Sequence, residues 1–220
     1  MDKSSLHTPH GVRHVGLDGP SCSGKGFVTA HLCQVFGDSL YVIGLGDMIR
    51  ERKQRDQEFA VNIREKTSNG KLLDYEIVTP MVIERYRLGL EMGYKFFLWE
   101  GYGRDHRQMT TLLSEIWSKD DESRIYMLAA SLQTCQANLA RAIAEGRRSG
   151  RDDNGQLPGR YQLHKDNDAG VRKAIKESGR CCNTIDANVP LLTVARQIAL
   201  RVRLMRRFNP QVQKVEAIAA

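Results

Sequence analysis

One glycine-rich segment near the amino end of the chain contains the residues best suited to chemistry. It reads Gly19-Pro20-Ser21-Cys22-Ser23-Gly24-Lys25-Gly26-Phe27, after an apolar run over residues 12–17. Glycines let the backbone curl so that successive N–H groups point inward, and the positive end of a following helix dipole adds to this anion site. Lys25 supplies a full charge for the outer phosphates of a nucleotide. The GxxxxGK spacing between a strand and a helix therefore predicts a phosphate-binding loop, with a glycine-rich turn without a ligand as the alternative.

Basic residues elsewhere in the chain fit the same chemistry. Phosphoryl transfer requires two anionic nucleotides in line, with their charge neutralised by cations from several segments. Arginine suits this because its planar fork holds two phosphate oxygens at once. The candidates lie in or beside predicted loops, and a solvated surface position is the alternative for each: Arg50, Arg104, Arg141, Arg151 and Arg160.

The elements that must position these residues follow from the hydrophobic pattern. Short apolar runs predict strands at residues 13–18, 40–44, 95–100, 124–129 and 181–186. Amphipathic patterns predict helices at residues 24–36, 47–57, 74–92, 106–117, 131–145, 166–177 and 190–208. Near-continuous apolar strands that alternate with helices are typical of a doubly wound α/β protein with a parallel, five-stranded sheet. Ligands then bind at the carboxyl ends of the strands.

The chain is predicted to form one domain. With 220 residues and 41% hydrophobic residues it can build a sizeable core, which we place at residues 12–210 between tails at 1–11 and 211–220. Two short helical patterns predict a small helical flap at about 46–73. A polar, turn-rich stretch predicts a mobile loop at about 146–160. Asp47 is expected to cap the helix that follows it.

Bulk properties favour a cytoplasmic protein that binds small anions. No apolar run approaches the roughly 18 residues that cross a bilayer, and the first residues lack the apolar centre of a signal peptide. The net charge of +7 suits anionic partners, and we expect phosphorylated small molecules rather than nucleic acid or membrane. Of the five cysteines, Cys181 and Cys182 are expected to be buried thiols, which points to a reduced compartment without structural zinc.

Five motifs in order resemble those of the adenylate kinase family of nucleoside monophosphate kinases. After the glycine-rich loop come Gly46-Asp47-Met48-Ile49-Arg50, then Gly70-Lys71-Leu72-Leu73. These are followed by Phe97-Leu98-Trp99-Glu100-Gly101-Tyr102-Gly103-Arg104 with Gln108, and by Arg141 with Ser149-Gly150-Arg151-Asp152-Asp153. The resemblance covers residues 12–201. It implies a P-loop three-layer fold with a monophosphate-binding flap and a short lid loop.

The resemblance also implies roles for residues. Arg50 and Arg104 would clamp the phosphate of the monophosphate, and the other candidate arginines would close over the triphosphate. Glu100 stands where the family has an aspartate that orients Mg²⁺ through water. The nucleotide acceptor would contact Leu45, Arg50, Leu73, Gly101, Arg104 and Gln108. The implied activity is phosphoryl transfer from ATP to AMP by a monomer.

The acceptor base and the activity itself have alternatives. In the family, glutamine at the position of Gln108 accompanies AMP, because a side-chain amide can both donate to and accept from adenine. The string Asp18-Gly19-Pro20-Ser21, however, also resembles cytidylate kinases, so a pyrimidine monophosphate kinase is the second hypothesis. A catalytically weak nucleotide-binding protein is the third. The departures that motivate it or bear on rate and specificity are Cys22 and Phe27 in the loop, Leu45, Gly103 in place of proline, and Glu145 in place of an arginine.

Overall fold

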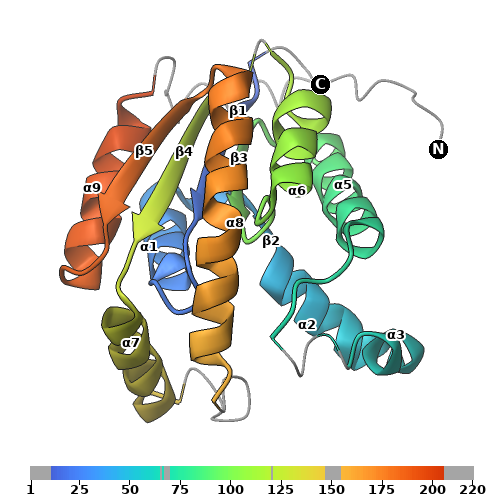
Figure 1. Ribbon diagram of the computed structural model, residues 1–220. Helices are drawn as coiled ribbons and strands as arrows, with labels where there is room; N and C mark the ends of the chain where they lie inside the picture. Colours follow the sequence, from blue (N-terminus) through green and yellow to red (C-terminus); the bar gives the residue numbers. More distant parts are fainter. Residues whose placement is uncertain (1–10, 65, 67–69, 120, 147–154, 206–220) are drawn as a thin grey trace.

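The strands described in the computed structural model form one all-parallel sheet (Figure 1). The structure describes residues 11–64, 66, 70–119, 121–146 and 155–205. The strands are β1 (Arg13–Asp18), β2 (Tyr41–Gly44), β3 (Phe96–Glu100), β4 (Glu122–Ala129) and β5 (Cys181–Asp186). Their spatial order is β2-β3-β1-β4-β5. The prediction of a five-stranded parallel α/β sheet is confirmed.

The sheet brings the ends of its central strands to one edge. Leu17 in β1 pairs with Glu100 in β3 and with Tyr126 in β4, and Gly44 in β2 also pairs with Glu100. The chain passes from β1 outward to the edge strand β2, returns to β3 beside β1, and then crosses β1 to reach β4. This reversal of strand order places a crevice outside the carboxyl ends, where doubly wound sheets bind ligands.

Helices cover both faces of the sheet (Figure 1). Helices α1 (Lys25–Phe36) and α9 (Leu191–Arg203) enclose one apolar core with the β1 side chains Val15 and Leu17. On the other face, α5 (Tyr75–Glu91), α6 (His106–Thr111) and α8 (Leu157–Ser178) enclose a second core. Helices α2 (Leu45–Arg55) and α3 (Gln57–Asn62) follow β2, a short 3₁₀ helix occupies Gly37–Ser39, and α7 (Leu132–Ala144) follows β4.

The edge strand β5 differs from the apolar central strands. Its only buried residue is Ile185, whereas all six residues of β1 are buried. Cys181 is exposed and Cys182 is partly buried, so the prediction of two buried thiols was wrong for Cys181. An edge strand has a neighbour on one side only, which leaves its first residue open to solvent. None of the five cysteines, all of which lie in the described part of the chain, forms a disulfide.

Several helices differ from their predicted ranges; α9, for example, was predicted to run to residue 208 and ends at Arg203. Helix α8 begins at Leu157, nine residues before the predicted start, with Pro158 in its first turn, where the missing N–H of proline costs nothing. Helix α2 begins at Leu45 and its N-cap is Gly44, so the prediction that Asp47 caps this helix was wrong. After α6 the chain forms a π-helical turn over Leu112–Ile116 instead of a continuous α-helix.

A buried polar network closes the amino-terminal edge of the sheet. His14 accepts a hydrogen bond from Trp99 Nε1 at 3.1 Å on Nδ1, and its Nε2 lies 3.0 Å from Asp121 Oδ2. The His14 ring also stacks on Trp117, with 4.8 Å between ring centroids. Arg180 donates to the carbonyl oxygens of the turn that carries Trp117. Burial lowers the pKa of His14, against the hydrogen bond to Asp121, which raises it.

Helices α6 and α8 touch at a glycine. A Cβ added to Gly170 in the middle of α8 would lie 3.2 Å from the Cβ of His106, the first residue of α6. This spacing is tighter than usual, so the two helices approach each other closely at this point.

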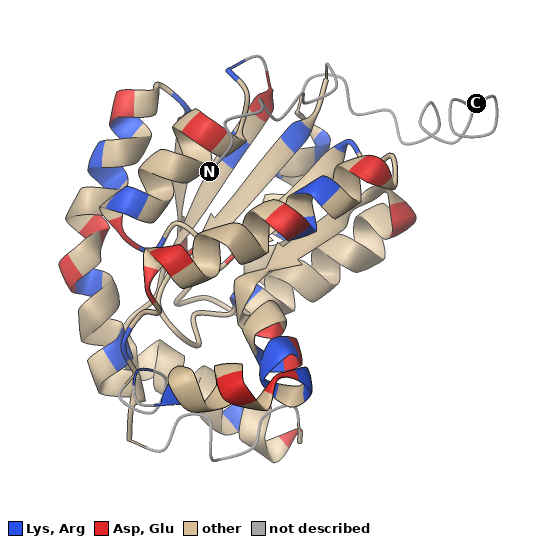
Figure 2. Ribbon diagram, turned by 90° about the vertical axis from the view of Figure 1, so that its right-hand side faces the viewer, with Lys and Arg blue, Asp and Glu red and all other residues tan. Residues whose placement is uncertain are grey.

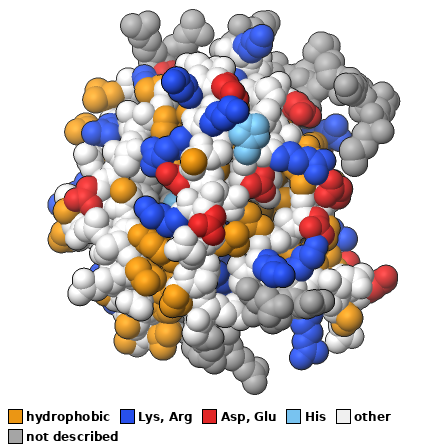
Figure 3. Space-filling model, in the orientation of Figure 1, with side chains coloured by type: hydrophobic (Ala, Val, Ile, Leu, Met, Phe, Trp, Pro, Cys, Tyr) orange, Lys and Arg blue, Asp and Glu red, His pale blue; other side chains and the backbone are white. Residues whose placement is uncertain are grey.

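Basic and acidic residues are interspersed along the outer helices (Figure 2). The face drawn in Figure 3 likewise intersperses basic and acidic side chains. Among the described residues, no helix has the length and apolar character to cross a membrane.

Candidate functional site

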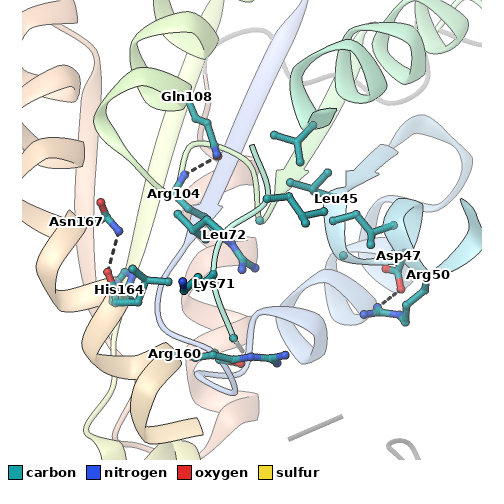
Figure 4. Close-up of a pocket in the computed structure, with 18 of the residues that line it drawn as sticks. Leu45, Asp47, Arg50, Lys71, Leu72, Arg104, Gln108, Arg160, His164 and Asn167 are labelled. Carbon is teal, nitrogen blue, oxygen red and sulfur yellow. Dashed lines mark hydrogen bonds and ion pairs between the residues drawn. The ribbon is translucent and has the colours of Figure 1, made fainter. Parts of the chain in front are cut away.

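A cavity of about 560 Å³ opens at the carboxyl edge of the sheet. Such a volume is typical of small-molecule sites. Its lining comes from the glycine-rich loop, α2, the segment before α5, the first turn of α5, the turn after β3, α6, the end of the α7 segment, and α8: Gly19, Ser21, Leu45, Gly46, Asp47, Ile49, Arg50, Lys53, Gly70, Lys71, Leu72, Leu73, Val78, Gly101, Arg104, Gln108, Gly146, Arg160, Leu163, His164 and Asn167. Figure 4 shows Arg104, Lys71 and Arg160 between α8 on one side and α2 on the other.

The glycine-rich loop curls into the N-terminus of α1. Gly24 is the N-cap with φ 101°, and a Cβ at this position would overlap Leu191. Lys25 is the first helical residue, and its Nζ donates to the carbonyl oxygens of Gly19 and Pro20, both at 2.7 Å. Burial and the charge of Arg104 lower the pKa of Lys25 to about 8. The ammonium thus lies under the loop, and Arg104 is the charged group with the largest effect on its pKa.

Cys22 has a backbone conformation that favours glycine. Its φ of 61° is the only positive value of a non-glycine residue in the described chain. Its carbonyl oxygen accepts a hydrogen bond from Asn138 Nδ2 at 3.0 Å, which ties the loop to α7. Phe27 packs against the core between α1 and α9 and so turns away from the cavity.

Arg104 forms no ion pair within the described part of the chain, although the carboxylates of Asp18 and Glu100 are close enough to affect it. Its Nε is buried, and within the described residues its guanidinium has no hydrogen-bond or ion-pair partner. A Cβ at Gly101 (φ 80°) would lie 3.0 Å from one Arg104 nitrogen, so glycine makes room for the guanidinium. Burial lowers the pKa of Arg104, against Asp18 and Glu100, which raise it. A partly buried guanidinium with an unsatisfied Nε beside a cavity is suited to bind an anion.

Gln108 is 3% exposed and lines the cavity, so it is not a surface glutamine. Its Oε1 accepts from the backbone N–H of Arg104 at 3.3 Å, and Asp105 caps the helix by accepting from Gln108 N at 2.8 Å. The amide NH₂ is therefore the part of Gln108 available to a ligand. Gly103, with φ 87°, forms the turn before it, and a Cβ there would lie 2.8 Å from Met109 Cε. Proline cannot adopt this φ.

The flap side of the cavity carries an arginine that is already paired. Arg50 forms an ion pair with Asp47, and both side chains are mostly exposed. Leu45 and Leu73 are buried and give this side of the cavity an apolar wall. Across the cavity, Arg160 Cγ would lie 3.1 Å from a Cβ at Gly70, so α8 reaches the Gly70-Lys71 turn.

One of the arginines expected at the site does not line the cavity, and the position of a second is not described. Arg141 lies in the last turn of α7, is exposed, and does not line the cavity. Arg151 lies outside the described residues. Glu145, the C-cap of α7, is also exposed, and Gly146 beside it reaches the cavity.

Glu100 is placed at the end of β3, facing α1. Its Oε2 accepts a hydrogen bond from Thr29 Oγ1 at 2.5 Å. No group of three or more histidine, cysteine, aspartate or glutamate side chains in the described chain is arranged to hold a metal ion. A single carboxylate is nevertheless compatible with Mg²⁺, which keeps several waters and takes most of its remaining ligands from phosphates.

Sequence reasoning missed polar residues on two sides of this edge. His164 and Asn167 of α8 line the cavity one and two turns beyond Arg160. Asp18, the last residue of β1, is 3% exposed, and neither carboxylate oxygen has a hydrogen-bond partner in the described structure. The hydroxyl of Ser23 in the loop is also buried without a partner. Unpaired buried groups concentrated beside a cavity indicate a site that a polar ligand completes.

No protein-family model matches the chain, and no curated protein matches its sequence. What the fold and site define is therefore an α/β protein with a five-stranded parallel sheet and a cation-lined cavity at its carboxyl edge.

Proposed function

We propose that the chain is a nucleoside monophosphate kinase of the adenylate kinase type, which transfers a phosphoryl group from ATP to AMP. The observation that supports this best is the convergence of Gly19 and Ser21 of the glycine-rich loop with Arg104, Arg50 and Arg160 around one cavity. These residues come from separate crossovers of the sheet, as two bound anionic nucleotides would require. The charge of Arg104 lowers the pKa of Lys25, so the two side chains lie close enough to interact electrostatically.

In this proposal the glycine-rich loop is a P-loop that binds the donor phosphates. Lys25 moves from the loop carbonyls to the phosphates when ATP binds, because phosphate oxygens are stronger acceptors for an ammonium. Arg104 binds the acceptor phosphate from inside the cavity. Glu100 would hold Mg²⁺ through water, and the metal would neutralise charge on the phosphates when bound.

The acceptor base is proposed to be adenine. Because the Oε1 of Gln108 already accepts a hydrogen bond, its NH₂ group would pair with a base that offers a hydrogen-bond acceptor. The N1 atom of adenine is such an acceptor. The pyrimidine bases also carry acceptors, so a pyrimidine monophosphate kinase remains the second candidate. The apolar wall of Leu45 and Leu73 favours neither adenine nor a pyrimidine base.

The test is a coupled spectrophotometric assay of ADP formation with ATP, Mg²⁺ and, in turn, AMP, CMP, UMP and dCMP. We expect the highest kcat/KM with AMP, and loss of most turnover in Lys25→Met and Arg104→Ala. A highest rate with CMP or UMP would favour the second candidate. ATP binding without acceptor-dependent ADP formation would favour a nucleotide-binding protein. Unchanged turnover in both variants would refute the proposed site.

A further inference from the structure

His164 occupies a position from which it can contact a ligand directly. It lies on the cavity side of α8 with Arg160 and Asn167, at the i, i+4 and i+7 spacing that places side chains on one face of a helix (Figure 4). Its ring is partly buried. Within the described residues, neither ring nitrogen has a hydrogen-bond partner. The nearby Asn167 side chain donates to the carbonyl oxygen of Leu163 and not to His164.

Asp18 provides an independent observation on the same side of the sheet. Side chains alternate along β1, so Asp18 faces the same way as Val12, whose core includes Val171, Ala174 and Ile175 of α8. Its carboxylate is buried and has no partner. A buried carboxylate without a hydrogen bond is costly, and a protonated imidazole is one group able to relieve that cost.

The charges around His164 come from several elements. Burial has the largest effect on its pKa, which it lowers, and Asp18 has the largest effect of any charged group, which raises it. Lys25 and Arg104 lower the pKa, whereas Asp168 raises it. Arg160 and Lys71 line the same cavity. In the protein without ligand, the neutral imidazole is therefore favoured.

A phosphate in the cavity reverses this balance. It brings negative charge to the open side of the ring, and it neutralises the lysine and arginine that oppose protonation. Both effects favour the imidazolium.

We propose that His164 binds a phosphate group of the nucleotide as an imidazolium, with its other ring nitrogen donating to Asp18, so that nucleotide binding takes up a proton. This inference rests on the proposed function, because it assumes that the cavity binds a phosphate monoester or polyphosphate. No bond to phosphorus is made or broken by His164; its proton comes from solvent.

The test is calorimetric titration of the full chain with AMP, and separately with ATP, in two buffers of different ionisation enthalpy between pH 6.5 and 8. The difference in heat between buffers gives the number of protons taken up. His164→Gln removes the proposed group, and Asp18→Asn removes the carboxylate that supports it. The matched control is His31→Gln, which changes a histidine of α1 that does not line the cavity. Subtracting the His164→Gln result cancels protons exchanged by the nucleotide itself.

Near pH 7, we expect the wild type and His31→Gln each to take up more protons per bound nucleotide than His164→Gln does, by about half a proton or more. In Asp18→Asn, uptake and affinity should both fall. As a measurement independent of any variant's folding, the His164 imidazole resonances of the wild type should titrate at higher pH with nucleotide bound than without it. Equal proton uptake in wild type and His164→Gln, or an unchanged NMR titration, would overturn the inference alone. Absence of any AMP or ATP binding would instead refute the proposed function.

Discussion

The unpaired guanidinium of Arg104 predicts opposite effects of one substitution on stability and on binding. Arg104→Met keeps the aliphatic stem but removes the charge. In the free protein the buried Nε has no partner, and an unsatisfied buried donor costs about 1–3 kcal/mol. The free energy of unfolding without ligand should therefore stay unchanged or rise, by up to that amount.

Binding of AMP should weaken in the same variant. A hydrogen bond to a charged group contributes about 1.5–3 kcal/mol, so loss of a two-pronged phosphate contact should cost about 3 kcal/mol or more. This corresponds to a loss of about 100-fold in affinity, since every 1.4 kcal/mol is about tenfold. Arg104→Lys should fall between the wild type and the methionine variant, because it keeps the charge but loses the planar fork.

Urea unfolding without nucleotide and calorimetric titration with AMP measure the two effects separately. The matched control is Arg107→Met: Arg107 is exposed, pairs with Glu76 and lies over the ring of Tyr75. Its AMP affinity should remain within about twofold of the wild type, as for surface changes away from a site. The reasoning is refuted if Arg104→Met destabilises the free protein by several kcal/mol, or if AMP binds it as tightly as it binds the wild type.

Three further predictions concern other residues. Cys22→Gly should be more stable than Cys22→Ala by about 1 kcal/mol, because both lack the thiol but only glycine tolerates φ 61° without strain; equal urea midpoints would show that the loop relaxes. Because His14 is buried with a lowered pKa, the unfolded chain binds the proton first as pH falls below about 6.5, so stability should drop by up to about 1.4 kcal/mol per pH unit. This drop, measured against His14→Phe by urea unfolding at pH 7.5, 6.5 and 5.5, should be smaller in the variant, where the remaining pH dependence comes from other groups such as His164. With a pKa of about 8 for Lys25, ATP affinity should decline above pH 8 by up to about tenfold per unit; a decline of the same slope in Lys25→Met would assign it to another group.

The fold was largely predictable from the sequence because the central strands are buried on both faces. Residues 96–99 of β3 form an uninterrupted apolar run, and Val15 and Leu17 of β1 pack in the same core, as expected for a covered parallel sheet. Strand β5 lies at its predicted residues, yet Cys181 is exposed. Whether a strand lies at the edge of the sheet depends on the strand order, which the local sequence pattern does not reveal.

The start of α8 was not predictable by local pattern. Residues 157–165 contain Pro158 and Gly159, which are poor helix formers within a helix, and few apolar residues. Packing of Leu157 into the core overrides this preference, and the extra turns place His164 on the cavity. The motif spacing located Arg104 and Gln108 at the cavity but also selected Arg141, which lies on the exposed end of α7. Spacing carries no information about the direction in which a helix end points.

The unpaired state of Asp18 also lies beyond sequence reasoning. An aspartate at a strand end before a glycine-rich loop is ordinary in composition. Its burial and its lack of partners depend on how α8 crosses the sheet, which is a property of tertiary packing.

The close contact between Gly170 and His106 has a mechanical consequence for helix α8. Six residues separate Gly170 from His164, a length of about 9 Å along a helix. If the two helices pivot where they touch, a tilt of about 10° would carry the imidazole about 1.5 Å, half the length of a hydrogen bond. A methyl group at position 170 would shift that pivot, and so would change the reach of a side chain two turns away without touching any ligand.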